Sequence, residues 1–352
     1  MRRRLFIVGG VVIVLVIIAV VVLVWRSGDG DADSRLAAAV ALAPEDSERF
    51  GWTDWSAVRE ELGSDVSADS STRDVEALLT DGFDADLTSA SALLQSAEVL
   101  QEEYGVSPAS LDWELFAQGP SGAVVLMGLP APLDLGALEQ RLTDLGYSEP
   151  EEEGGVWLGG SDVLASIDGV VTPELEFVAI DAEERVLVAS DQEEPLTDWR
   201  DAQRGSDVSD GVSDVVAAVG GAISASVYTG DHACAALAMS QAGSVDRAAG
   251  AELIEEAGEV SPLRGFAIAA LSGGGARVAM AFETEEQART NADARSTLAS
   301  GPAPGQGGSF SDRFELGEVV ADGEVVTMEL TPRPNAFVVS DLAHGPVLFA
   351  TC

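Results

Sequence analysis

Two stretches of this sequence share one pattern and decide the fold. Residues 113–129 read WELFAQGPSGAVVLMGL, and residues 265–282 read GFAIAALSGGGARVAMAF. In each stretch two apolar runs flank a glycine-containing break, which is typical of a β-hairpin. Each predicted hairpin is followed by a segment with helical spacing, at residues 133–145 and 284–298. The sequence therefore predicts the same ββα unit twice.

The similarity extends on both sides of the two hairpins. Four further blocks recur in the same order: residues 53–55 (Thr-Asp-Trp) with 197–199, residues 63–67 (Gly-Ser-Asp-Val-Ser) with 205–209, residues 97–108 with 251–262, and residues 177–189 with 337–350. Because the order is kept, we expect a tandem duplication, with repeat unit A at residues 53–190 and repeat unit B at 197–352. About 12 extra positions around residues 222–243 are expected to be an insertion specific to unit B.

Both units are expected to contain helices, then the ββα segment, then further short strands. We expect those strands at residues 156–158, 176–180 and 185–189 of unit A, and at 314–320, 324–330, 336–340 and 347–350 of unit B. The predicted class is α+β, an antiparallel sheet with helices packed on one face. The sequence leaves open whether the two units share one sheet.

The N-terminal segment has the pattern of a membrane anchor. Residues 5–25 are an apolar run that, as a helix, would span the ~30 Å hydrocarbon core. Arg2, Arg3 and Arg4 precede the run, so residues 1–4 are expected in the cytoplasm and the long C-terminal part outside. The alternative is a cleaved secretory signal, but this run is longer than a typical signal core. Residues 26–52 are predicted to be a linker and a short helix.

The charge of the chain limits its partners. The sequence has 60 acidic and 19 basic residues, a formal net charge of −41, and none of the basic residues is Lys. Such a surface repels phosphate backbones, so we expect no nucleic-acid partner. The expected membrane contact is the N-terminal helix alone.

The two cysteines, Cys234 and Cys352, are expected to form one disulfide in an oxidising compartment. The alternative is a zinc site that adds His232 and His344, but the spacing fits no common zinc pattern. We expect no metal and no cofactor.

No catalytic motif is found in the sequence. Asp29, Asp31 and Asp33 have the spacing of a calcium loop but lack its glycine and its final glutamate. With 60 acidic residues, a pair of carboxylates is no evidence for a glycosidase. Trp55 and Trp199 each follow Thr-Asp and are expected to pack just inside a helix start rather than against a ligand.

Several segments are similar to one family: residues 50–62, 84–114, 231–241, 282–314 and 342–352. They resemble uncharacterised membrane-anchored proteins of actinobacteria. The resemblance implies a place in the cell envelope and no activity. The first functional hypothesis is a non-enzymatic extracytoplasmic domain that binds a protein partner or small ligand. The alternatives are a cell-wall-acting hydrolase with an unrecognised carboxylate site and a structural spacer.

Overall fold

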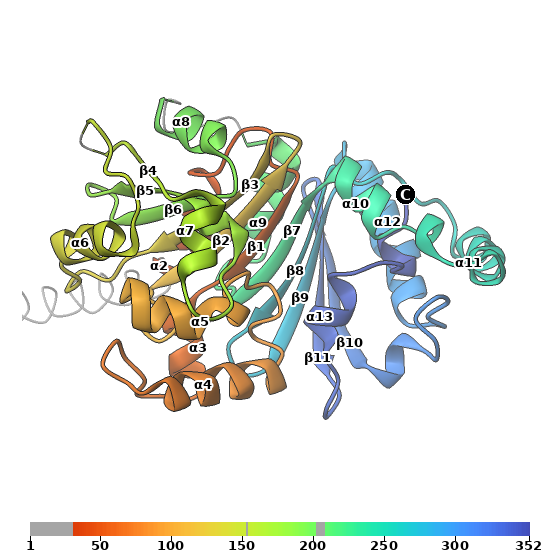
Figure 1. Cartoon of the computed structure of the whole chain (residues 1–352). Coiled ribbons are helices and arrows are strands. Elements are labelled where there is room, and N and C mark those ends of the chain that lie inside the picture. The colour runs from red at the N-terminus through yellow and green to blue at the C-terminus, as the bar shows by residue number, and fades with distance from the viewer. Residues whose placement is uncertain (1–30, 153, 202–207) are drawn as a thin grey trace, which may run out of the picture.

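The computed structural model describes residues 31–152, 154–201 and 208–352, and its strands form one antiparallel sheet (Figure 1). The strands are β1 (Arg49–Thr53), β2 (Trp113–Gly119), β3 (Gly122–Gly128), β4 (Val156–Leu158), β5 (Phe177–Asp181), β6 (Val186–Ser190), β7 (Ser224–Thr229), β8 (Gly265–Leu271), β9 (Gly275–Ala281), β10 (Phe314–Asp322) and β11 (Val325–Pro332). Their order across the sheet is β10-β11-β9-β8-β7-β1-β2-β3-β6-β5-β4. The expected α+β class with a large antiparallel sheet is confirmed.

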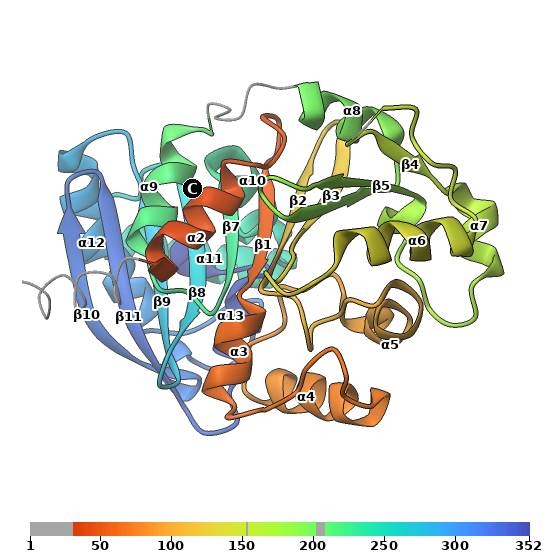
Figure 2. The same cartoon turned by 90° about the vertical axis from the view of Figure 1, so that its left-hand side faces the viewer.

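The helices cover both faces of this sheet. They are α2 (Asp31–Val40), α3 (Trp55–Glu61), α4 (Thr72–Asp84), α5 (Ala97–Val99), α6 (Leu135–Leu145), α7 (Gly160–Ser166), α8 (Glu193–Asp201), α9 (Asp210–Ala218), α10 (Gly230–Ala236), α11 (Ser244–Ala257), α12 (Glu285–Ala299) and α13 (Val338–Leu342). One core cluster joins α2, α8 and α9 to one face, and a larger one joins the remaining long helices to the other. Figure 2 shows α2 and α9 side by side over the central strands. The prediction of helices on one face only is wrong, since the strands are apolar on both faces.

The central strand β1 was not predicted. It pairs antiparallel with both β2 and β7, and four of its five residues are buried. Burial on both faces removes the alternation of apolar and polar residues by which a strand is recognised. Residues 26–52 therefore hold more than the expected linker and short helix: besides α2 they include most of β1, the strand that joins the two halves of the sheet.

The two halves of the sheet have the same strand order. From β1 outward the order is β1-β2-β3-β6-β5, and from β7 outward it is β7-β8-β9-β11-β10. In both halves the first strand leads through helices to a hairpin, then a helix, then a second hairpin (Figure 1). The question of one sheet or two is settled by the β1–β7 pairing, which makes them one.

Two of the expected equivalences between units are wrong, and so is the expected insertion in unit B. Residues 336–340 and 347–350 are not strands but form α13 and a 3-10 turn at Leu348–Ala350. Thr197 to Trp199 lie inside α8, whereas Thr53 to Trp55 span the end of β1 and the start of α3. Residues 222–243 are no insertion, because β7 occupies in its half the place of β1. In a chain rich in Ala and Val, short sequence segments can be identical although they form elements that are not equivalent in the two halves.

The hairpins themselves formed where expected. β2 and β3 are joined through a Gly119–Gly122 pair, and β8 and β9 through a Leu271–Gly275 pair. The helix after the first hairpin, α6, begins at the N-cap Asp134 and ends at Gly146, whose φ of 99° is accessible to glycine without strain. Thr284 caps α12 by accepting a hydrogen bond from the backbone N–H of Gln287.

The predicted membrane anchor at residues 5–25 lies outside the described residues. Within residues 31–152, 154–201 and 208–352 no helix is long and apolar enough to cross a bilayer.

Candidate functional site

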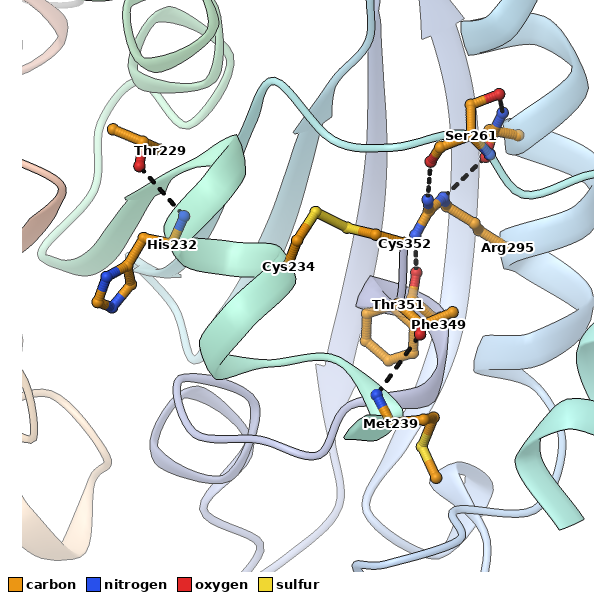
Figure 3. The surroundings of a disulfide bond; sticks show 10 residues. Thr229, His232, Cys234, Met239, Ser261, Arg295, Phe349, Thr351 and Cys352 are labelled. Carbon is orange, nitrogen blue, oxygen red and sulfur yellow. Dashed lines mark hydrogen bonds between the residues drawn. A yellow bond between two sulfur atoms is a disulfide. The ribbon is translucent and has the colours of Figure 1, made fainter. Parts of the chain in front are cut away.

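Cys234 and Cys352 are joined in the structure as the sequence predicted. Their Cα atoms are 5.5 Å apart, which is ordinary disulfide geometry, and 118 positions separate them in the chain. The bond ties the C-terminal residue to α10 (Figure 3). Its place is therefore structural: it closes the tail against the second half of the sheet.

A buried arginine fixes the same tail from the other side. Arg295 on α12 is fully buried and donates to the backbone carbonyls of Phe349 and Ser261 at 2.5 and 2.6 Å (Figure 3). Its guanidinium also lies over the ring of Phe282, 5.3 Å from the centroid. Burial lowers the pKa of Arg295 to about 9. The polar groups around it are carbonyls and the amide of Asn291 rather than a carboxylate.

The two histidines do not join the cysteines. His232 stacks on Tyr228 with ring centroids 5.3 Å apart, and Figure 3 shows its ring on the side of α10 away from Cys234. The exposed His344 lies within hydrogen-bond distance of the Ser340 carbonyl. Among the described residues no group of three or more His, Cys, Asp or Glu side chains is arranged to hold a metal ion.

Only one of the two tryptophans behaves as the Thr-Asp-Trp motif predicted. Trp55 is the first residue of α3, fully buried, behind the N-cap Asp54. Trp199 lies late in α8 and donates its indole N–H to the carbonyl of Leu42. Both therefore pack within the fold, and neither lines the pocket described next.

The first half of the molecule contains a pocket of about 580 Å³ between α3, the loop of residues 66–69 and the first turns of α6. Its apolar lining comes from Val66, Tyr104, Ala109, Pro130, Leu133 and Leu138. Its charged lining comes from Arg59, Arg141, Asp69, Asp112 and Asp134. This size and this mixture of apolar wall and few charged groups are typical of small-molecule sites.

Arginines hold the walls of the pocket in place. Each donates to two backbone carbonyls of one segment: Arg59 to Pro108 and Leu111, Arg141 to Glu102 and Glu103 of the π-helical turn Leu100–Tyr104, and Arg185 to Pro130 and Leu133. Hydrogen bonds from a cation to carbonyls are stronger than neutral ones and fix the loops. The pocket is thus preformed by its own polar contacts.

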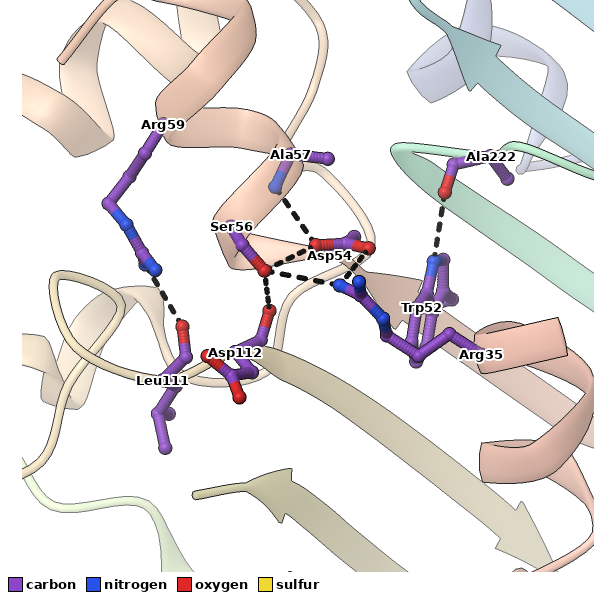
Figure 4. Close-up of polar contacts among 9 residues, drawn as sticks. All are labelled: Arg35, Trp52, Asp54, Ser56, Ala57, Arg59, Leu111, Asp112 and Ala222. Carbon is purple, nitrogen blue, oxygen red and sulfur yellow. Dashed lines mark hydrogen bonds and ion pairs between the residues drawn. The ribbon is translucent and has the colours of Figure 1, made fainter. Parts of the chain in front are cut away.

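Asp112 connects the pocket to a polar cluster at the start of α3. Arg35 forms an ion pair with Asp54 at 2.8 Å, and the Ser56 hydroxyl lies 3.0 Å from both a carboxylate oxygen of Asp54 and the backbone carbonyl of Asp112, either of which can accept its hydrogen (Figure 4). Burial raises the pKa of the Asp112 carboxyl, and the charges of Arg35 and Arg59 oppose that rise. Burial likewise lowers the pKa of Arg59. Asp112 is therefore held among cations rather than exposed freely to water.

Glu114 lies on β2, two residues after Asp112, and is a buried carboxylate outside the pocket lining. It is fully buried and accepts from the Trp55 indole at 3.0 Å, the Ser91 hydroxyl at 2.7 Å and the Ala92 backbone N–H at 2.6 Å. Burial raises its pKa to about 7, against the effect of these hydrogen bonds. Because it has no exposed surface, Glu114 supports the packing of α3 on β2 and has no access to a ligand.

No pattern in the sequence predicted the pocket. Its members are drawn from segments between residues 59 and 141, and no motif unites them. One signal was available. The chain has 60 acidic residues and no Lys, so its few arginines were candidates for site residues.

Searches for similar proteins add nothing to this geometry: we find no match to a protein-family model, to a curated protein or to a solved structure. Function is therefore inferred from the residues of this chain.

Proposed function

We propose that this chain is a non-enzymatic, extracytoplasmic domain of the cell envelope that binds a small ligand in the pocket of its first half. The observation that carries the proposal is the preformed pocket of about 580 Å³, lined by apolar side chains with a few charged groups. A small ligand fits this concave site better than the broad face of a protein partner, which a flat apolar patch would suit. Residues 5–25 would tether the domain to the membrane.

The equal strand order of the two halves supports a second part of the proposal, that they arose by duplication. Among the described residues, the region of the second half that corresponds to this pocket holds the buried Arg295 and the disulfide-bound tail instead. On this view one half kept a binding site and the other became a support that fixes the sheet.

The alternative, a cell-wall-acting hydrolase, is favoured by one observation: Asp112 lines the pocket and burial raises its pKa. A carboxylate pair would need a second acid beside Asp112, and neither Asp69 nor Asp134 is among the charges that act on it. Asp134 caps α6 through Gly136 and Ala137, and Asp69 is exposed on the loop at the rim. The pocket therefore fits binding better than acid–base hydrolysis, and a spacer would need no pocket at all.

The test is a ligand screen on the full chain in lipid nanodiscs, with thermal unfolding as the readout. Ala137 is exposed on α6 and lines the pocket, so Ala137→Trp should fill the pocket without disturbing the core. Gln140→Trp, on the same helix but outside the lining, is the matched control. Stabilisation by a small molecule that Ala137→Trp abolishes and Gln140→Trp retains supports the proposal. Stabilisation that survives Ala137→Trp would overturn it.

A further inference from the structure

The pocket contains two arginines, Arg59 and Arg141, whose hydrogen-bond donors are only partly used within the described residues. In both Arg59 and Arg141 one terminal nitrogen, Nη1, donates hydrogen bonds to two backbone carbonyls. Within the described residues, the Nε and Nη2 groups of both arginines make no hydrogen bond. The Nε–Nη2 edge is the one that a carboxylate or phosphate group engages with two parallel hydrogen bonds.

The aspartates of the pocket do not compete for these edges. Asp134 accepts from the backbone N–H groups of Gly136 and Ala137 at the start of α6. Asp112 lies among the charges of Arg35, Arg59 and Arg185 without hydrogen bonding to any of them in the described residues. Asp69 is exposed on the rim loop. An anion entering the pocket would therefore meet guanidinium edges that none of the three aspartates hydrogen-bonds in the described residues.

The remaining wall favours an apolar body next to the anion. Pro132 and Ala137 are exposed and Leu133 is half-buried, and all three line the same pocket as the arginines. Apolar area removed from water there adds to the affinity, at roughly 25 cal/mol per Å². A bare inorganic anion would leave this wall unused.

We propose that the pocket binds an amphipathic oxyanion, a carboxylate or phosphate monoester on an apolar body, with the anionic group on the Nε–Nη2 edges of Arg59 and Arg141. The inference rests on the proposed ligand-binding function and specifies its ligand class. The net charge of the chain is −41, so its surface as a whole repels anions. The two arginines would attract an anion at this site despite that repulsion.

The experiment is isothermal titration of the full chain in nanodiscs, with the heat of empty nanodiscs subtracted. The probes share one body and differ in head group: 4-phenylbutyrate, 4-phenylbutyl phosphate, 4-phenylbutylamine and 4-phenylbutanol. We expect at least one anion to bind about tenfold more tightly than the amine and the alcohol, as one charge-assisted hydrogen bond supplies. The tighter of the two anions identifies which oxyanion the site takes.

Arginine variants identify where the anion sits. Arg141 is exposed, so Arg141→Gln should fold and should weaken the anion by about tenfold. Arg141→Lys keeps the charge but cannot form two parallel hydrogen bonds, so its affinity for the anion should lie between those of the wild type and Arg141→Gln. The control Arg73→Gln removes an exposed arginine from α4, outside the pocket, and should change affinity by less than about twofold.

Three results would overturn the inference. Equal or tighter binding of the amine or alcohol, still abolished by Ala137→Trp, would remove the oxyanion class and leave the ligand-binding function intact. Equal losses of anion affinity in Arg141→Gln and Arg73→Gln would show a general charge effect rather than a site. If no probe binds, both the class and the proposed function fail.

Discussion

Asp86 in the first half of the molecule accepts two hydrogen bonds from Ser340 in the second, one from its backbone N–H at 3.1 Å and one from its hydroxyl at 2.7 Å. The same carboxylate accepts from the backbone N–H of Val339 at 2.6 Å. These N–H groups belong to the first turn of α13, whose own N-cap residue, Phe337, makes no side-chain hydrogen bond. A residue of one half thus caps a helix of the other, and the two halves are joined away from the sheet as well as within it.

Replacing this cap should weaken the union of the halves. Asp86→Asn keeps a residue that tolerates the φ of 57° but loses the charge, and we expect unfolding free energy to fall by about 2 kcal/mol. Urea unfolding measures the loss. The control is Asp84→Asn, an exposed change at the end of α4, which should cost less than about 0.5 kcal/mol. Similar losses for the two variants would contradict the capping role.

Glu114 should make stability depend on pH near neutrality. Its folded pKa is about 7, above the ordinary value of 4.5, so the folded state holds the proton more tightly than the unfolded chain. The stability it contributes is complete below about pH 4.5 and is lost as pH rises to about 7. The contribution of Glu114 to the unfolding free energy should differ by on the order of 3 kcal/mol between these two ends of the pH range.

Chemical denaturation at several pH values checks this effect. Glu114→Gln should flatten the profile between pH 5 and pH 7.5, whereas Glu318→Gln, at an exposed position of β10, should leave it unchanged. If the stability of Glu114→Gln depends on pH as steeply as that of the wild type, another group titrates in this range.

The disulfide should stabilise the second half more than the first. A loop of 118 positions implies ~4–5 kcal/mol in the chain-entropy model. Because Arg295 also holds the tail at Phe349, we expect Cys352→Ser to cost less, about 3 kcal/mol. Hydrogen exchange should rise first in α10. Adding reductant to the wild type should give the same loss and leave Cys352→Ser unaffected, and two free thiols in the non-reduced protein would refute the bond.

The proposed topology places every residue beyond Ser27 outside the membrane. Protease added to intact protoplasts should degrade this part of the chain, whereas it should spare a cytoplasmic control protein. A protected chain, or a mature form that begins after Ser27 in the supernatant, would remove the anchor.

Local patterns in the sequence were enough for the hairpins and the helices after them. β2, β3, α6, β8, β9 and α12 lie within a few residues of their predicted bounds, since turn glycines and the caps Asp134 and Thr284 act locally. β1 could not be found this way because it is buried on both faces. The apolar residues Val338, Val339 and Leu342 suit a strand or a helix, and the cap supplied by Asp86, more than 250 positions away, accompanies the helix.

The candidate site depended on contacts that the sequence does not encode locally. The disulfide followed from counting cysteines, but the pocket needs Arg59 and Arg141 brought together from α3 and α6. Their partners are backbone carbonyls, which carry no residue signature. Spacing in the chain therefore gave no reason to link them.

The central claim, that the pocket of the first half holds a small ligand, is tested most directly by chemical protection at Ala137. Both native cysteines are bonded to each other, so Ala137→Cys introduces a single free thiol at the pocket wall, and Gln140→Cys introduces one outside it. Alkylation rates are measured with and without a saturating phenyl probe, 4-phenylbutyrate or 4-phenylbutylamine. The account predicts that one of the probes slows alkylation at position 137 by about tenfold while the rate at position 140 stays unchanged. Equal rates at position 137 with and without both probes would contradict it.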